Sequence, residues 1–155
     1  MRSIHSWLTE YSESHQTTFN QVTHWVCVPA IMLSLLGLLW SIQTPALLST
    51  VSPLLNWAVI FVLSALFFYS LLSIPLALGM VAVTMIMLAL VYWLDSLATP
   101  LWQLSVGIFV VAWIGQFVGH LVEGRRPSFF KDLQFLLIGP VWLLAKVYKR
   151  AGIKY

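Results

Sequence analysis

Three histidines and one carboxylate are the side chains of this sequence whose types and positions could do chemistry. His15 lies shortly before a long apolar run and His24 lies directly at its start. His120 lies near the end of another apolar run, three residues before Glu123. Titratable groups are costly to bury in a membrane, so those found there are functional by default. Imidazole binds iron, zinc, copper and nickel, and two or three histidines with one carboxylate and open positions suit non-haem Fe(II) and dioxygen. We therefore predict a metal site.

The spacing of His15 and His24 requires the chain to turn between them. They are nine residues apart, and at about 100° per residue a straight helix would place them on opposite faces. Residues 17–20 include two threonines and Asn20, which are poor inside helices and good at their caps. We predict a break near residues 17–20, followed by a helix that carries Asn20 and His24 on one face at i, i+4 spacing. Asn20 is expected to orient the site and not to bind the metal.

The end of the last long apolar run supplies a second polar face. Gln116, His120 and Glu123 share it, at positions i−4, i and i+3. Glu123 could bind the metal, accept a hydrogen bond from an imidazole N–H, or pair with Arg125. Gln116 is expected to contact the substrate or to support a ligand.

Composition assigns the chain to membrane proteins. Of its 155 residues, 60% are hydrophobic and only 8% are charged, whereas a soluble domain has roughly 25% charged residues. The eight basic residues lie mainly near the C-terminal end, and no stripe of lysine and arginine with interleaved aromatics suggests nucleic acid. The single cysteine, Cys27, excludes an intrachain disulfide and is interpreted as a buried core residue. His5 is likewise interpreted as structural.

The expected fold is an all-α bundle of about four transmembrane helices. A span needs about 20 apolar residues, and four segments qualify: Trp25–Ile42, Leu54–Ser73, Pro75–Leu94 and Leu101–Val122. An interfacial amphipathic helix is expected at 4–15, turn-like connectors between the spans, and a shorter membrane-associated helix within Leu133–Tyr148. The single domain then comprises a ligand arm (1–24), four spans (25–122), a basic loop (123–132), and a C-terminal helix with a basic tail (133–155).

Basic residues predict the orientation. The loop EGRRPSFFKD holds three of them, Arg125, Arg126 and Lys131, and the connectors between spans hold none. The positive-inside tendency places this loop and the N-terminus on the cytoplasmic side. An even number of spans brings the three histidines to that same face. The tail is basic too, so the last segment is not expected to cross fully.

Two sequence blocks resemble a known family. They are the pattern YxxxHxxxxNxxxHxxxxP over residues 11–29 and QFVGHLVEGRRP over residues 116–127. Together they resemble the 2-hydroxy fatty acid dioxygenases, which comprise a fungal endoplasmic-reticulum enzyme of phytosphingosine breakdown and its bacterial relatives, formerly a domain of unknown function. The likeness spans nearly the whole chain, including a Tyr69-x5-Pro75 element and Pro140.

This resemblance implies an Fe(II)-dependent α-oxidation that uses dioxygen. A long-chain 2-hydroxy fatty acid would lose its carboxyl carbon as carbon dioxide and become an acid one carbon shorter. His15, His24 and His120 match the family histidines proposed to hold iron. Arg125 or Arg126 could pair with the substrate carboxylate or serve as membrane anchors. The short chain, without a KDEL-type ending, favours a bacterial inner membrane over the endoplasmic reticulum.

Three alternatives remain open at the level of sequence. The histidines could hold zinc in a lipid hydrolase, His24 and His120 could ligate b-type haem in an electron carrier, or the protein could be a non-catalytic scaffold with structural histidines. Chain-length preference and oligomeric state are left undetermined.

Overall fold

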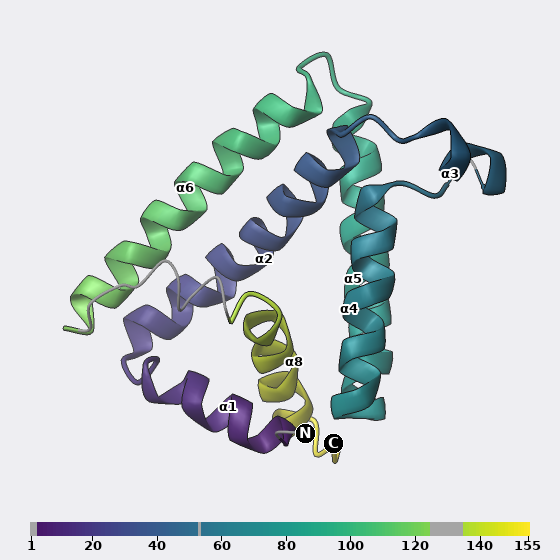
Figure 1. The fold of residues 1–155 in the computed structure, drawn as a ribbon. Helices are drawn as coiled ribbons and strands as arrows, with labels where there is room; N and C mark the ends of the chain where they lie inside the picture. The colour runs from purple at the N-terminus through teal and green to yellow at the C-terminus, as the bar shows by residue number, and fades with distance from the viewer. Residues whose placement is uncertain (1–2, 53, 125–134) are drawn as a thin grey trace.

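The computed structural model describes residues 3–52, 54–124 and 135–155, and all regular structure within them is helical. The helices are α1 (Ile4–Glu13), α2 (Thr18–Ser41), α3 (Ala46–Val51), α4 (Trp57–Leu72), α5 (Ile74–Asp95), α6 (Leu101–Val122) and α8 (Ile138–Arg150). In Figure 1, α2 and α6 form one pair, α4 and α5 a second, and the short helices α1 and α8 lie at the end that holds both termini. The expected membrane helical bundle is confirmed.

Polar side chains set the helix starts at the sharp turns. The Thr17 hydroxyl accepts a hydrogen bond from the Asn20 backbone N–H (3.3 Å) and begins α2. Ser73 caps α5 in the same manner, and Pro75 lies in its first turn, where its missing N–H costs little. Gly124 follows α6 with φ +73°, the left-handed conformation that commonly ends a helix.

Three described helices, α2, α5 and α6, are long and apolar enough to cross a membrane. The second predicted span, Leu54–Ser73, corresponds to α4, which has 16 residues and is about 24 Å long at about 1.5 Å per residue. Large apolar side chains cover the outside of the bundle, such as Val26, Phe67 and Val111, each about two-thirds exposed or more. Lipid is the medium in which such a surface is stable.

Small residues bring α2 and α6 close together near the histidines. A Cβ at Gly119 would lie 2.5 Å from the Asn20 side-chain oxygen, and one at Gly115 would lie 2.6 Å from the Cys27 sulfur. Neither separation is possible without a shift, so glycine permits this approach. The helix that carries His120 therefore packs directly on the helix that carries Asn20.

Several boundaries differ from the expectations. The helix that contains the first apolar run begins at Thr18, capped by Thr17 as the predicted break requires, and therefore extends beyond the run that starts at Trp25. The connector after the first span was expected to be turn-like. This expectation is wrong, because the connector contains the short helix α3. The basic loop with Arg125 and Arg126, and the start of the last predicted segment, lie outside the described residues.

Candidate metal centre

Three elements far apart in the sequence bring the histidines into one group. His15 lies in the turn between α1 and α2, His24 in α2 and His120 in α6. All three are buried, with exposed fractions of 3, 1 and 4%. One ring nitrogen from each lies within 4.8 Å of the others, which is close enough for all three to hold one metal ion. The predicted break does occur, at residues 14–17, just before Asn20.

Hydrogen bonds fix the tautomers of two of these histidines. The Nδ1–H of His15 donates to the Tyr11 carbonyl, and the Nδ1–H of His24 donates to the Asn20 carbonyl (2.8 Å). A carbonyl oxygen only accepts, so Nδ1 carries the proton in both neutral rings and Nε2 carries the lone pair. Metal-ligating histidines commonly have this support.

The two Nε2 atoms of His15 and His24 then face each other 2.8 Å apart. With Nδ1 protonated in both neutral rings, neither has a proton to donate there, so the two Nε2 lone pairs suit a shared cation, either a proton or a metal ion. Burial is the main cause that lowers the pKa of His15 from the usual 6.5 to about 4; the hydrogen bond to Tyr11 opposes this shift and the nearby His120 adds to it. A proton is therefore disfavoured near neutral pH. The donor set fits a metal ion.

Ring packing disfavours haem. An axial pair must lie on opposite sides of the macrocycle, but the ring centroids of His24 and His120 are 5.1 Å apart. His15 packs against both, with centroids at 4.1 Å from His24 and 5.1 Å from His120. A porphyrin has no room between these rings.

Glu123 lies outside the histidine group and holds the ligand arm. Its carboxylate accepts hydrogen bonds from the Gln16 backbone N–H (2.7 Å), the Asn20 side-chain amide (2.6 Å) and the Thr17 hydroxyl (3.3 Å). Partial burial alone would raise the pKa of Glu123, but these hydrogen bonds outweigh it and hold the pKa below its usual value. The sequence had suggested three roles for Glu123, and this one was not among them.

Asn20 connects the parts of the site, as an orienting residue should. It is fully buried, and its side-chain amide donates both to Glu123 and to the Ser14 carbonyl (3.1 Å). Its own backbone carbonyl accepts from His24. One residue thus fixes the turn, the end of α6 and a histidine tautomer.

An aromatic wall from α1 and α8 encloses the histidines, and sequence reasoning missed most of it. Tyr11 stacks on His15 with ring centroids 4.2 Å apart, and Trp142 lies 5.3 Å from His15. The Trp142 indole N–H donates to the Ser12 hydroxyl (2.8 Å), and the Lys146 ammonium lies 3.6 Å from the Trp142 ring centroid. Tyr11 belongs to the first motif, but no spacing rule links residues so far along the chain as Trp142 and Lys146.

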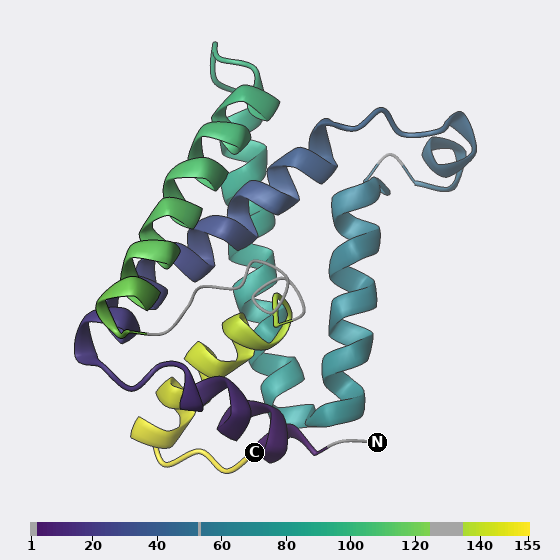
Figure 2. The same ribbon diagram turned by 60° about the vertical axis from the view of Figure 1, so that its left-hand side comes forward.

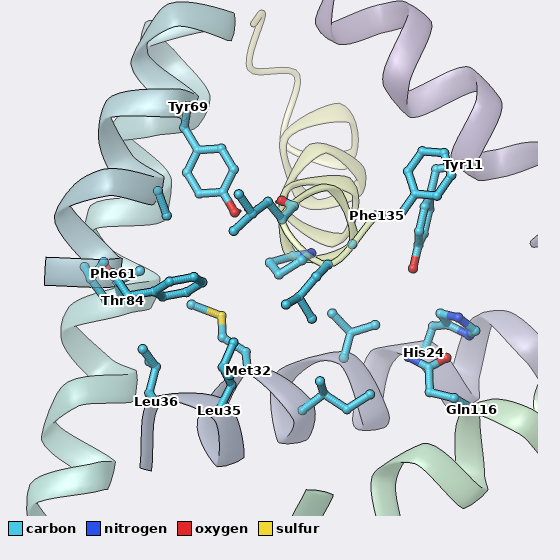
Figure 3. Close-up of a pocket in the computed structure, with 18 of the residues that line it drawn as sticks. Tyr11, His24, Met32, Leu35, Leu36, Phe61, Tyr69, Thr84, Gln116 and Phe135 are labelled. Carbon is cyan, nitrogen blue, oxygen red and sulfur yellow. Dashed lines mark hydrogen bonds between the residues drawn. The ribbon is translucent and has the colours of Figure 1, made fainter. Parts of the chain in front are cut away.

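Gln116 lies beside the histidines, at one end of an apolar cavity. The cavity runs between α2, α4 and the start of α8, with His24 and Gln116 at one end and Phe61 and Thr84 at the other (Figure 3). Gln116 is 6% exposed, and its buried side-chain oxygen has no hydrogen-bond partner among the described residues. A buried acceptor of this kind can receive a hydrogen bond from a ligand.

The remaining candidates lie away from the centre. His5 is exposed on α1 and stacks on Tyr155 with centroids 5.8 Å apart, and Cys27 is buried against α6, as expected. Figure 2 shows that the chain turns from α1 into α2 beside the end of α6. Arg125 and Arg126 fall outside the described residues.

Comparison with known proteins identifies the chain. The 2-hydroxy-palmitic acid dioxygenase MPO1 of Saccharomyces cerevisiae is 29% identical over 153 residues, which is 96% of this chain and 82% of the yeast protein. No solved structure matches the chain. The family described as 2-hydroxy-palmitic acid dioxygenase Mpo1-like matches residues 1–151. A match over nearly the full length shows that this membrane protein belongs to the Mpo1-like family.

Proposed function

We propose that this protein is an Fe(II)-dependent dioxygenase that converts a long-chain 2-hydroxy fatty acid into the acid one carbon shorter and carbon dioxide. The observation that carries the proposal is the group of three buried histidines with two Nε2 lone pairs turned toward each other. The family membership and the activity named for the yeast relative support the substrate class and the use of dioxygen.

His15, His24 and His120 would hold the metal. Iron fits the proposed reaction because it can exchange electrons with dioxygen, whereas zinc is redox-silent; imidazole nitrogens suit both ions. Bound iron would supply the activation of dioxygen and of the 2-hydroxy carboxylate.

The overall reaction balances without an external reductant. R–CH(OH)–COOH and O2 give R–COOH, CO2 and H2O, so the bond between the first two carbons breaks and the substrate supplies all four electrons that dioxygen takes up. The protein's own residues orient the substrate and exclude water: Tyr11 and Trp142 cover the histidines, and Gln116 offers its oxygen to the substrate hydroxyl. Arg125 or Arg126 remains the candidate partner of the carboxylate.

The test is turnover by purified protein. The detergent-solubilised protein is loaded anaerobically with Fe(II) and given 2-hydroxyhexadecanoic acid, oxygen is admitted, and pentadecanoic acid is measured by mass spectrometry. We expect product that requires iron, oxygen and His24, with His24→Ala inactive and His5→Ala active. His5→Ala is the matched control because His5 is exposed and lies outside the group.

The alternatives predict other outcomes. A zinc hydrolase would act on lipid esters with zinc and without oxygen. A scaffold would bind no metal, and His24→Ala would leave its function intact. Either result, from folded protein, would overturn the proposal.

A further inference from the structure

We infer that the apolar cavity beside the histidines holds the acyl chain of the substrate and that Phe61, at the end far from the histidines, sets the preferred chain length. This inference rests on the proposed function for the identity of the polar head. It adds a specificity-determining residue in α4, a helix that contributes no histidine to the centre.

The cavity begins at the metal centre. His24 and Gln116 line it at one end, where Tyr11 also points toward His24 (Figure 3). The unpartnered oxygen of Gln116 is the polar feature that marks this end as the place for a hydroxyl donor. A head group bound at the histidines therefore has its chain directed into the cavity.

The rest of the cavity is mainly apolar, and the Tyr69 hydroxyl that lines it already donates to the Leu137 carbonyl (2.7 Å). The face of α2 that lines it presents Val28, Ile31, Met32 and Leu35. Thr84 lies at the far end, but its hydroxyl already donates to the Met80 carbonyl of its own helix (2.8 Å). It therefore presents no free donor there, and the far end suits a terminal methyl group.

The length of the cavity matches a long acyl chain. His24 and Leu36 both line it and are twelve residues apart on α2, which corresponds to about 18 Å at about 1.5 Å per residue. An extended hydrocarbon advances about 1.25 Å per carbon, for bonds of about 1.5 Å that meet at about 111°. The stretch of α2 that lines the cavity, from His24 to Leu36, is therefore as long as an extended chain of about 14 carbons.

The side-chain positions on α4 provide a matched pair for the test. Phe61 lines the end of the cavity far from the histidines, whereas Phe67, on the same helix, is 67% exposed on the outer surface. Phe61→Ala should deepen the cavity and Phe61→Trp should shorten it. The same two substitutions at Phe67 should leave it unchanged.

The experiment compares 2-hydroxy acids of 12 to 20 carbons on the iron-loaded full-length protein. Each buried methylene contributes about a fourfold change in binding. Phe61→Ala should therefore raise kcat/KM for the 18-carbon acid relative to the 16-carbon acid, which is two methylenes shorter, by roughly 15-fold, and Phe61→Trp should shift the optimum to shorter acids. If Phe61 and Phe67 variants share the wild-type profile, or shift it alike, the inference is overturned.

A binding measurement separates this inference from the proposed function. The anaerobic increase in melting temperature caused by each acid reports binding without turnover. If no acid is turned over, the proposed function fails, but a length optimum that moves with Phe61 would still place the chain in the cavity. If turnover occurs but the chain length that binds best is the same in wild type and in the Phe61 variants, the acyl chain binds elsewhere. Gln116→Leu should weaken binding of 2-hydroxyhexadecanoic acid and leave hexadecanoic acid unaffected.

Discussion

The carboxylate of Glu123 should be required for tight metal binding although it does not touch the metal. It ties the end of α6, which carries His120, to the arm that carries His15. In Glu123→Ala the arm loses all three hydrogen bonds to α6 that this side chain accepts. We expect metal to bind more weakly, because part of the binding energy must then order the arm.

The structure gives the magnitude. The Gln16 N–H and the Thr17 hydroxyl lie near the surface, where water replaces the lost acceptor at little cost. Asn20 is fully buried, and one of its amide hydrogens is left without an acceptor, which costs about 1–3 kcal/mol. At a factor of ten per about 1.4 kcal/mol, this is roughly a 5- to 140-fold loss of affinity. Substitution of groups that support metal ligands typically costs about 10- to 100-fold.

The assay is anaerobic titration with Co(II), whose visible spectrum reports coordination, together with the melting temperature of the metal-free protein. Glu123→Gln keeps one acceptor oxygen and should fall between wild type and Glu123→Ala. Glu13→Ala is the control, because it removes the same charge from an exposed site on α1. Unchanged affinity and unchanged melting temperature in Glu123→Ala would refute the reasoning, as would an equal loss in Glu13→Ala.

Three further predictions concern protons, packing and the metal itself. The pKa of His15 is lower in the folded protein than in the unfolded chain, so the unfolded chain binds a proton at His15 more readily. The metal-free protein should therefore lose roughly 3 kcal/mol of stability as pH falls from about 6.5 to about 4. Denaturant unfolding at each pH measures this loss, and a free energy of unfolding that stays constant or rises as pH falls would contradict it. Gly119→Ala places a Cβ 2.5 Å from the Asn20 oxygen and should cost about 1–3 kcal/mol. Gly107→Ala, on the same helix with nothing within 4 Å, should cost nothing, and equal melting temperatures for the two variants would rule out the tight contact. Removal of the metal by a chelator should lower the melting temperature of the metal-loaded wild-type protein and leave that of His15→Ala unchanged, as measured by calorimetry. An equal decrease in both proteins would show that the metal lies elsewhere.

Local sequence signals predicted the helices well where the residue types of a short segment decide whether it forms a helix and where that helix begins. Long apolar runs correspond to α2, α5 and α6, and a proline in the first turn marks the start of α5. The incompatibility of a nine-residue spacing with one helical face predicted the break before Asn20. These signals act within one or two helical turns, so they can be read from the sequence without knowledge of the fold.

Signals that depend on packing were not visible in this way. Asn20 and His24 precede or border the apolar run that starts at Trp25, and only the packing of the helices shows that both are buried. Residue type suggested three roles for Glu123, but the geometry gives it a fourth, because its partners are more than 100 residues away.

The sequence by itself determined that this is a helical membrane protein with three histidines of interest, because composition and periodicity are local properties. The tertiary structure decided how they are used. It brought the histidines within 4.8 Å of one another, set Nε2 of His15 against Nε2 of His24, and placed an apolar cavity beside them. These features depend on how α1, α2, α6 and α8 pack, and glycine, asparagine and glutamate contacts between distant segments fix that packing. Such contacts have no signature in the spacing of residues along a single chain.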